Sequence, residues 1–217
     1  PITYPDDPLH PGYVSTIPAC DSALIVANND FTLSNIIIDG MSEYDETYDP
    51  DLNNDYYHTQ GTGNHGLSTK AESPLVVVND GAEVALYGTA IQNNYNNNGG
   101  NPGGTSGIMV NDNGTLSLYD GTTVTGNQNG AGITLEGNMN VSGVVNVANN
   151  TDENGTSKNV SIIPDVEGET PAYITIDAEN GGLDPTSRIG VTKSIPSFEE
   201  YTPIAYCKDV DMIVEAF

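Results

Sequence analysis

The sequence has no tryptophan and only five basic residues against thirty acidic ones, which gives its 217 residues a formal charge of −25. Nucleic acids are therefore excluded as partners, because phosphate binding requires clustered lysine and arginine. Anionic membrane surfaces are excluded on the same ground. The five cations form no patch along the chain: Lys70, Lys158, Arg188, Lys193 and Lys208.

Cysteines and long apolar runs are also scarce. Cys20 and Cys207 lie at opposite ends of the chain. With four or five repeats between them they would be on the order of 20 Å apart, whereas a disulfide requires Cα atoms within about 7 Å, so we expect none unless an end segment folds back over the repeats. No apolar run is long enough to span a bilayer, so we expect no direct membrane insertion, and the strong like charge favours a monomer. The sequence begins at Pro1 without a signal peptide, which indicates a piece of a longer protein.

What the sequence does contain is a recurring set of short apolar alternations. Between Ile108 and Asn127 three alternations are separated by clusters of asparagine, aspartate and glycine. Alternation of period two predicts strands, and such clusters predict turns. The expected inward positions of the five copies are Leu24/Val26, Phe31/Leu33, Ile36/Ile38; Val76/Val78, Val84/Leu86, Ile91; Ile108/Val110, Leu116/Leu118, Val124; Ile133/Leu135, Met139/Val141, Val147; and Val160/Ile162, Ile174/Ile176, Ile189/Val191.

A unit of about 20–30 residues with three short strands, repeated end to end, indicates a solenoid. We predict an all-β, right-handed, single-stranded parallel β-helix of about five coils over residues 21–195, with coils about 4.8 Å apart. Residues 1–20, which contain five prolines, are expected to form an extended N-terminal cap or linker, and residues 196–217 a closing strand or cap. Insertions at 41–74 and 93–107 both follow a third strand, so they should project from the same corner.

An asparagine recurs three residues after the last inward apolar residue of the middle coils, as Asn94, Asn127 and Asn150. Asparagine tolerates left-handed backbone, and its amide can bond to a stacked neighbour. The sequence therefore predicts an asparagine ladder along the axis. The first coil has Met41 at this position, so the ladder should begin in the second coil.

The coil starts GAGI (Gly130–Ile133) and TSGI (Thr105–Ile108) lead to coil ends VANN and VTGN. These segments resemble the repeats of polymorphic outer-membrane proteins and, more widely, β-helical repeats of bacterial surface proteins in the pectate-lyase-like superfamily. The resemblance spans roughly residues 75–192, with an aliphatic residue replacing the phenylalanine of the family's FxxN repeat. It implies a surface-exposed or secreted segment, often adhesive, at the bacterial cell surface or outside the cell, and it transfers no catalytic residue.

The insertions contain the candidate binding residues. Exposed tyrosines among aspartate and asparagine are typical of glycan-binding or protein-binding surfaces, although such rings can also pack an insertion onto the solenoid. The expected partner is a glycan or a host or cell-surface protein. The candidate tyrosines are Tyr44, Tyr48, Tyr56, Tyr57 and Tyr95.

The same insertion contains a candidate calcium loop. Asp49, Asp51, Asn53 and Asp55 follow the D-x-D-x-N spacing, but the sixth-position glycine and twelfth-position glutamate are missing, with Gln60 in the latter place. Calcium is the one cofactor that the sequence suggests, and a solvated acidic loop is the alternative.

A carbohydrate-active enzyme, either a polysaccharide hydrolase or a lyase, is the rival interpretation. Hydrolysis needs carboxylates about 5–10 Å apart. Asp112 and Asp120 fall in different turns, whereas Asp39 and Asp120 could share a corner. A lyase needs a base beside an acidic cluster, and neither Lys158 nor Arg188 lies near one in the sequence. The sequence thus favours a non-catalytic stalk or adhesin-like module.

Overall fold

The structure, a computed structural model, describes residues 2–3, 16–17, 23–40, 73–96, 104–163, 172–193, 205–207 and 213–214. Strands dominate these residues, together with the 3₁₀ helix η2 (Ala178–Asn180). Within the described ranges, no helix has the length and apolar character needed to cross a membrane.

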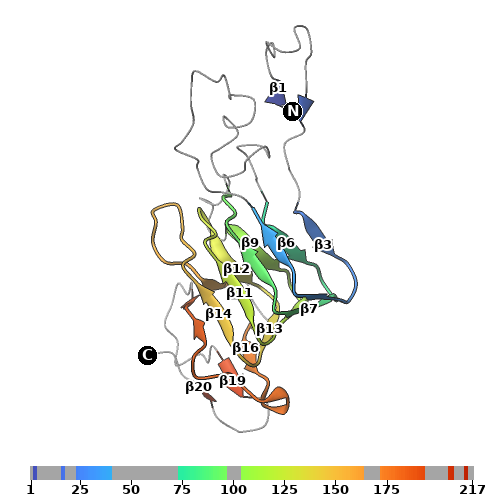
Figure 1. Ribbon diagram of the computed structural model, residues 1–217, viewed down its shortest axis with the longest axis vertical. Helices are drawn as coiled ribbons and strands as arrows, with labels where there is room; N and C mark the ends of the chain where they lie inside the picture. Colours follow the sequence, from blue (N-terminus) through green and yellow to red (C-terminus); the bar gives the residue numbers. More distant parts are fainter. Residues whose placement is uncertain are drawn as a thin grey trace.

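Three parallel sheets run along the axis of the molecule, and each coil contributes one strand to each (Figure 1). The first sheet contains β3 (Ile25–Ala27), β6 (Val76–Val78), β9 (Thr105–Val110), β12 (Ala131–Leu135), β15 (Val160–Ile162) and β18 (Val191–Lys193). The second contains β4 (Phe31–Ser34), β7 (Glu83–Tyr87), β10 (Thr115–Leu118), β13 (Asn138–Val141), β16 (Ile174–Ile176) and β19 (Ala205–Cys207). The third contains β5 (Ile37–Asp39), β8 (Ala90–Gln92), β11 (Thr122–Thr125), β14 (Val145–Ala148) and β17 (Arg188–Ile189).

The order of strands in every sheet follows the order of coils, so the chain is a parallel β-helix and the predicted fold class is confirmed. Five coils contain all three strands, and β18 and β19 continue the stack into a sixth. The β-helix therefore extends past residue 195, where the sequence had placed its end. Beyond β19, β20 (Ile213–Val214) pairs antiparallel with β19, while β1 (Ile2–Thr3) pairs antiparallel with β2 (Thr16–Ile17).

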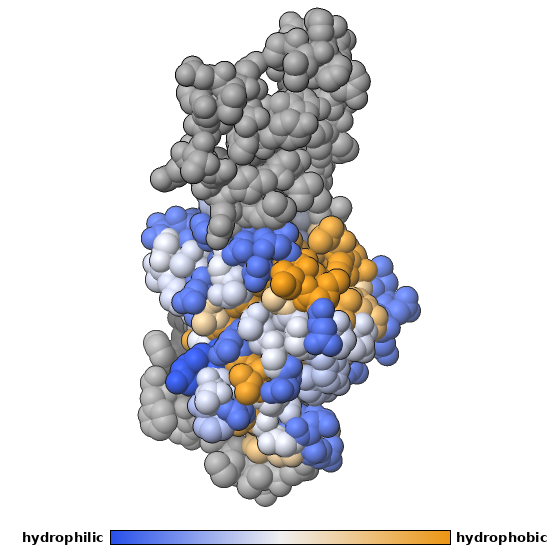
Figure 2. Space-filling view, in the orientation of Figure 1, coloured by the Kyte–Doolittle hydropathy of each residue, from blue (hydrophilic) through white to orange (hydrophobic). Residues whose placement is uncertain are grey.

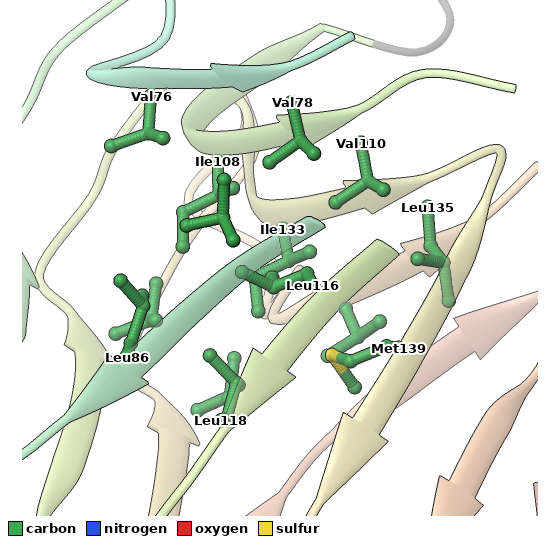
Figure 3. Packing of buried hydrophobic residues seen from close by; sticks show 14 of the residues in the cluster. Val76, Val78, Leu86, Ile108, Val110, Leu116, Leu118, Ile133, Leu135 and Met139 are labelled. Carbon is green, nitrogen blue, oxygen red and sulfur yellow. The ribbon is translucent and has the colours of Figure 1, made fainter. Parts of the chain in front are cut away.

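The core is a single column of stacked aliphatic side chains (Figure 3). Val78, Val110 and Leu135 are partners in adjacent strands, and all three are completely buried. Removing such side chains from water supplies the main stabilisation, about 1.5–3 kcal/mol for each fully buried residue. Because a single coil cannot bury its own inward face, the coils depend on their neighbours for stability.

The first coil corrects the predicted register. Leu24 and Val26 were expected inside, but they are 64% and 47% exposed, and Ile25 and Ala27 face inward instead. The segment LIVA allows both alternations, and a shift by one residue exchanges the two faces of a strand. The observed register aligns Asn28 with Asn79, whose Nδ2 donates to the Asn28 Oδ1 at 2.8 Å.

Two further positions differ from the expected pattern. Ile36 is exposed because it lies in the corner that follows Asn35, whose φ is 54°, and only Ile38 of the predicted pair is buried. Val191 belongs to β18 of the sixth coil, where it pairs with Val160, so Ile189 alone represents the third strand of the fifth coil. The second insertion is also shorter than expected, since β9 already begins at Thr105.

The exposed residues of the first coil are largely apolar. Figure 2 shows hydrophobic side chains gathered over β3 and β6 at the N-terminal end of the described stack. The large apolar residues exposed on this coil are Leu24, Val26, Ile36 and Ile37.

Candidate functional site

The corner that joins each third strand to the first strand of the next coil is the most regular polar feature of the molecule. We call it the ladder corner, because it contains Asn94, Asn127 and Asn150, all buried. A left-handed residue precedes each of these asparagines and turns the backbone so that the amide points inward. These left-handed residues are Asn93, Gly126 and Asn149, with φ of 56°, 70° and 59°.

The three predicted asparagines are hydrogen-bonded into one chain. The Asn94 backbone N–H donates to the Asn127 Oδ1 at 3.2 Å, and the Asn127 Nδ2 donates to the Asn150 Oδ1 at 2.9 Å. The Asn150 Nδ2 donates in turn to the Asn159 Oδ1 at 3.2 Å. Because these amides are buried, each hydrogen bond replaces one that water would otherwise provide. The side chains of the ladder are therefore engaged in structural hydrogen bonds.

Asn159 was not among the predicted ladder residues, since it does not follow an inward apolar residue by three positions. The strand register places Asn159 at the level of Gly132 in the neighbouring coil. A Cβ at Gly132 would lie 2.5 Å from the Asn150 Cγ and Nδ2. Gly132 of the GAGI segment therefore leaves room for the Asn150 amide. In the next coil Asn159 stands at the position equivalent to Gly132. That replacement of glycine by asparagine was the signal available in the sequence.

The ladder corner also anchors both insertions. Asn94 Nδ2 donates to the carbonyl of Ser73, at the end of the first insertion, at 3.2 Å. The same nitrogen donates at 2.7 Å to the carbonyl of Ser106, in β9, one residue beyond the start of the strand that follows the second insertion. On the entry side of the first insertion, the Gly40 N–H donates to the Gln92 carbonyl at 2.8 Å. One buried side chain thus ties together the bases of two loops that are distant in sequence.

Tyr95 is the one candidate tyrosine within the described residues, and it lies at the base of the second insertion. It forms a parallel bridge with Gln128 in the next coil and is half-buried. Its neighbour Asn96 is buried and donates to the Thr105 carbonyl at 2.6 Å. Tyr95 is therefore positioned by the backbone of the next coil, and its neighbour Asn96 joins the two ends of the second insertion.

The remaining predicted site residues lie outside the described ranges. Among the residues that the structure does describe, no group of three or more histidine, cysteine, aspartate or glutamate side chains could hold a metal ion. Cys207, in β19, is a free thiol. The predicted residues outside the described ranges are Tyr44, Tyr48, Tyr56 and Tyr57 of the binding set, and Asp49, Asp51, Asn53 and Asp55 of the calcium loop.

A second, shorter asparagine ladder lies between the first and second sheets. The Asn111 Nδ2 donates to the Asn79 Oδ1 at 2.8 Å, and Asn79 donates to Asn28 at the same distance. Each residue directly follows the second inward residue of a first strand, as in the repeated sequence Val-Asn-Asp at 78–80 and 110–112. That repeat was a usable sequence signal, and the sequence interpretation missed it.

The outer face of the second sheet contains a pair of tyrosines that the sequence interpretation also missed. The rings of Tyr87 and Tyr119, in adjacent coils, are stacked with centroids 4.4 Å apart and planes 13° apart. Burial raises the pKa of Tyr119; the Ser117 hydrogen bond lowers it, and neighbouring Tyr87, Asp177 and Glu83 raise it further. We call this pair the tyrosine stack.

The carboxylates considered for hydrolysis do not converge. Asp39 ends β5 and accepts hydrogen bonds from Gln92 and Asn93. Asp120 precedes β11 and accepts the Val144 N–H at 2.8 Å. The two aspartates therefore lie at opposite ends of the third sheet, separated by a strand of about four residues or roughly 13 Å. The prediction that Asp39 and Asp120 could share a corner is wrong.

Comparisons with known proteins gave no relatives: no protein-family model, no curated protein and no solved structure matches the chain.

Proposed function

We propose that this β-helix is a non-catalytic segment of a surface-exposed or secreted protein, a rigid stalk or adhesin-like module that presents its corner insertions to a glycan or a protein. The observation that carries the proposal is the position of Asn94. Its buried amide bonds to the bases of both insertions, at Ser73 and Ser106, and so holds two loops at one place on a stiff scaffold.

A scaffold of this kind suits binding because the loops begin from fixed points. Hydrogen bonds at the base of a loop reduce the conformational entropy that it must lose when it binds a ligand. A third loop, between β14 and β15, leaves from the same corner and is closed by the Thr151–Ser157 bridge. Its Asp152 Oδ1 accepts the backbone N–H groups of Asn154 and Thr156. The three loops thus leave the β-helix at the ladder corner.

The tyrosines and carboxylates of the first insertion would supply the contact surface. Tyrosine provides a flat apolar face with one polar atom, which suits sugar rings and protein interfaces. The candidate calcium ligands Asp49, Asp51, Asn53 and Asp55 lie within the same insertion, so calcium would order the loop that carries the tyrosines. Location outside the cell or at the bacterial surface belongs to the same proposal.

The test is a binding screen on a glycan array and on cell surfaces, with and without calcium. The intact chain is compared with a variant in which residues 43–66 are replaced by a short glycine-serine linker. A matched control shortens residues 152–156, which removes acidic residues from the same corner but no tyrosine. All three proteins are first shown to unfold at comparable temperatures.

We expect the intact chain and the control to bind the same ligand and the variant lacking 43–66 to lose at least tenfold in affinity. Binding that survives this deletion would place the ligand elsewhere on the molecule. An intact chain that binds no glycan and no cell surface would refute the adhesive role and leave only the stalk.

A further inference from the structure

The tyrosine stack ends abruptly at its N-terminal side. Tyr119 covers one face of the Tyr87 ring, but Tyr87 is still 42% exposed. In the first coil, the residue in register with Tyr87 is Ser34, and the Asn35 N–H donates to the Tyr87 carbonyl at 2.9 Å. A serine therefore occupies the place where a third ring would continue the stack.

The space above Ser34 has the thickness of one coil, about 4.8 Å. A planar group of a ligand can enter it and lie on the Tyr87 ring much as Tyr119 does from the other side. Ser34 and Asn35 are both exposed and offer oxygen acceptors at its edge, with the Asn35 Nδ2 already donating to the Ser34 Oγ. We call this space the Ser34 slot.

The charge of this face of the β-helix selects the ligand. Asp30 and Glu83 lie on the same face, at the other end of the strands and roughly 13 Å from the slot, where the Asp30 Oδ1 accepts the Glu83 N–H at 2.9 Å. Residues 23–40, 73–96 and 104–135 contain no lysine or arginine. An exposed aromatic face without neighbouring cations, on a chain of charge −25, favours a cation.

We propose that the Ser34 slot binds an arginine side chain from a basic segment of a partner protein, with the guanidinium stacked on Tyr87. Arginine fits better than lysine because its guanidinium is planar, is less strongly hydrated and stacks on aromatic rings. Its N–H groups can donate to the Ser34 Oγ and the Asn35 Oδ1 while the ring covers one face. This site lies on the second sheet and does not depend on the corner insertions or on their proposed role.

The test uses three short peptides, acetyl-Gly-X-Gly-amide, in which X is arginine, lysine or the neutral isostere citrulline. Each is titrated into the intact chain and followed by the ring resonances of Tyr87 in NMR spectra, at about 0.15 M and 1 M salt. The Debye length falls from about 8 Å to 3 Å between these conditions, so attraction by the overall charge is suppressed while stacking contacts remain.

Three variants define the site. Tyr87→Leu removes the ring, and Ser34→Tyr fills the slot while leaving Tyr87 in place. Tyr206→Leu is the matched control, because Tyr206 is also exposed on the second sheet but lies at its other end against Tyr173. Thermal unfolding establishes that each variant is folded before titration.

We expect the arginine peptide to bind more tightly than the other two and to shift the Tyr87 ring resonances. Tyr87→Leu should weaken it about two- to fivefold, the range expected for an exposed cation–π contact, Ser34→Tyr should do the same, and Tyr206→Leu should not. Equal binding of the citrulline peptide, or no effect of either slot variant, would overturn the proposal. So would a neutral oligosaccharide such as cellopentaose, if it shifted Tyr87 where the arginine peptide did not.

Discussion

Replacing Asn127 with alanine should destabilise the β-helix more than any single surface change. Asn127 is fully buried; its Oδ1 accepts the Asn94 N–H, and its Nδ2 donates to the Ile91 carbonyl and to the Asn150 Oδ1. The substitution leaves the Asn94 N–H without its acceptor, at a cost of about 1–3 kcal/mol, and removes two further bonds worth about 0.5–1.5 kcal/mol each. We expect a loss of about 2–6 kcal/mol.

The assay is urea unfolding followed by circular dichroism, with Asn146→Ala as the control. Asn146 lies in β14 and is half-exposed, so its replacement should change the free energy of unfolding by less than about 0.5 kcal/mol. For a chain of this length, a loss of about 3 kcal/mol corresponds to a Tm lower by roughly 6–12 °C. An Asn127→Ala variant that unfolds together with Asn146→Ala would refute the view that the ladder stabilises the fold.

A second substitution at the same position separates the donor from the acceptor. Asn127→Asp keeps an oxygen for the Asn94 N–H but turns a carboxylate towards the Asn150 Oδ1. Burial would raise the pKa of the new carboxyl above its unfolded value of about 3.9. The variant should therefore be closest to wild type near pH 4 and lose stability as the pH rises through that raised pKa. A destabilisation independent of pH between 4 and 7 would contradict this reasoning.

Three further outcomes follow from the structure. Leu86→Ala should lower the free energy of unfolding by about 2–5 kcal/mol, because Leu86 is fully buried. Leu24→Ala should lower it by less than about 0.5 kcal/mol, because Leu24 faces outward. Equal losses in urea unfolding would indicate that Leu24 and Val26 face inward instead. Gly132→Ala should destabilise the fold, because the added Cβ would clash with the Asn150 amide. A double-mutant cycle should show a smaller loss of stability for Gly132→Ala in an Asn150→Ala background. Full additivity of the two losses would count against this contact. The raised pKa of Tyr119 means that the unfolded chain loses this proton before the folded chain does as the pH rises. The contribution of this group to stability is therefore complete below about pH 10 and is lost above it. Absorbance titration at about 295 nm should show a late-titrating component that Tyr119→Phe removes, and an unchanged curve would contradict this prediction.

The apolar alternation was sufficient to predict the architecture. Val76/Val78, Ile108/Val110 and Ile133/Leu135 each combine a clear alternation with a turn cluster, and the structure stacks them in register. Where the alternation was ambiguous, the prediction failed. LIVA at 24–27 permits two faces, and the choice between them is made by pairing with β6 and by the Asn28–Asn79 bond, neither of which is local.

The polar features show the same division between local and long-range information. Asn94, Asn127 and Asn150 could be found because each keeps a constant offset from an inward residue. Asn159 could not be found that way, because it enters the ladder from the opposite side of the corner, at the level of Gly132. Tyr87 and Tyr119 each follow an inward leucine, but only the coil register shows that their rings meet.

The side-chain oxygens of the ladder corner all accept from the same direction. The Oδ1 atoms of Asn127, Asn150 and Asn159 each accept the backbone N–H of the preceding ladder asparagine, and the last side chain, Asn159, donates to the Ser157 hydroxyl at 3.0 Å. The row of acceptors therefore has a first and a last member. A protein engineer who wished to lengthen the molecule by inserting one more coil between Asn94 and Asn150 would need an amide at that corner, because the side chain must both accept the N–H of the preceding coil and donate to the oxygen of the following one, and a carboxylate has no proton to donate.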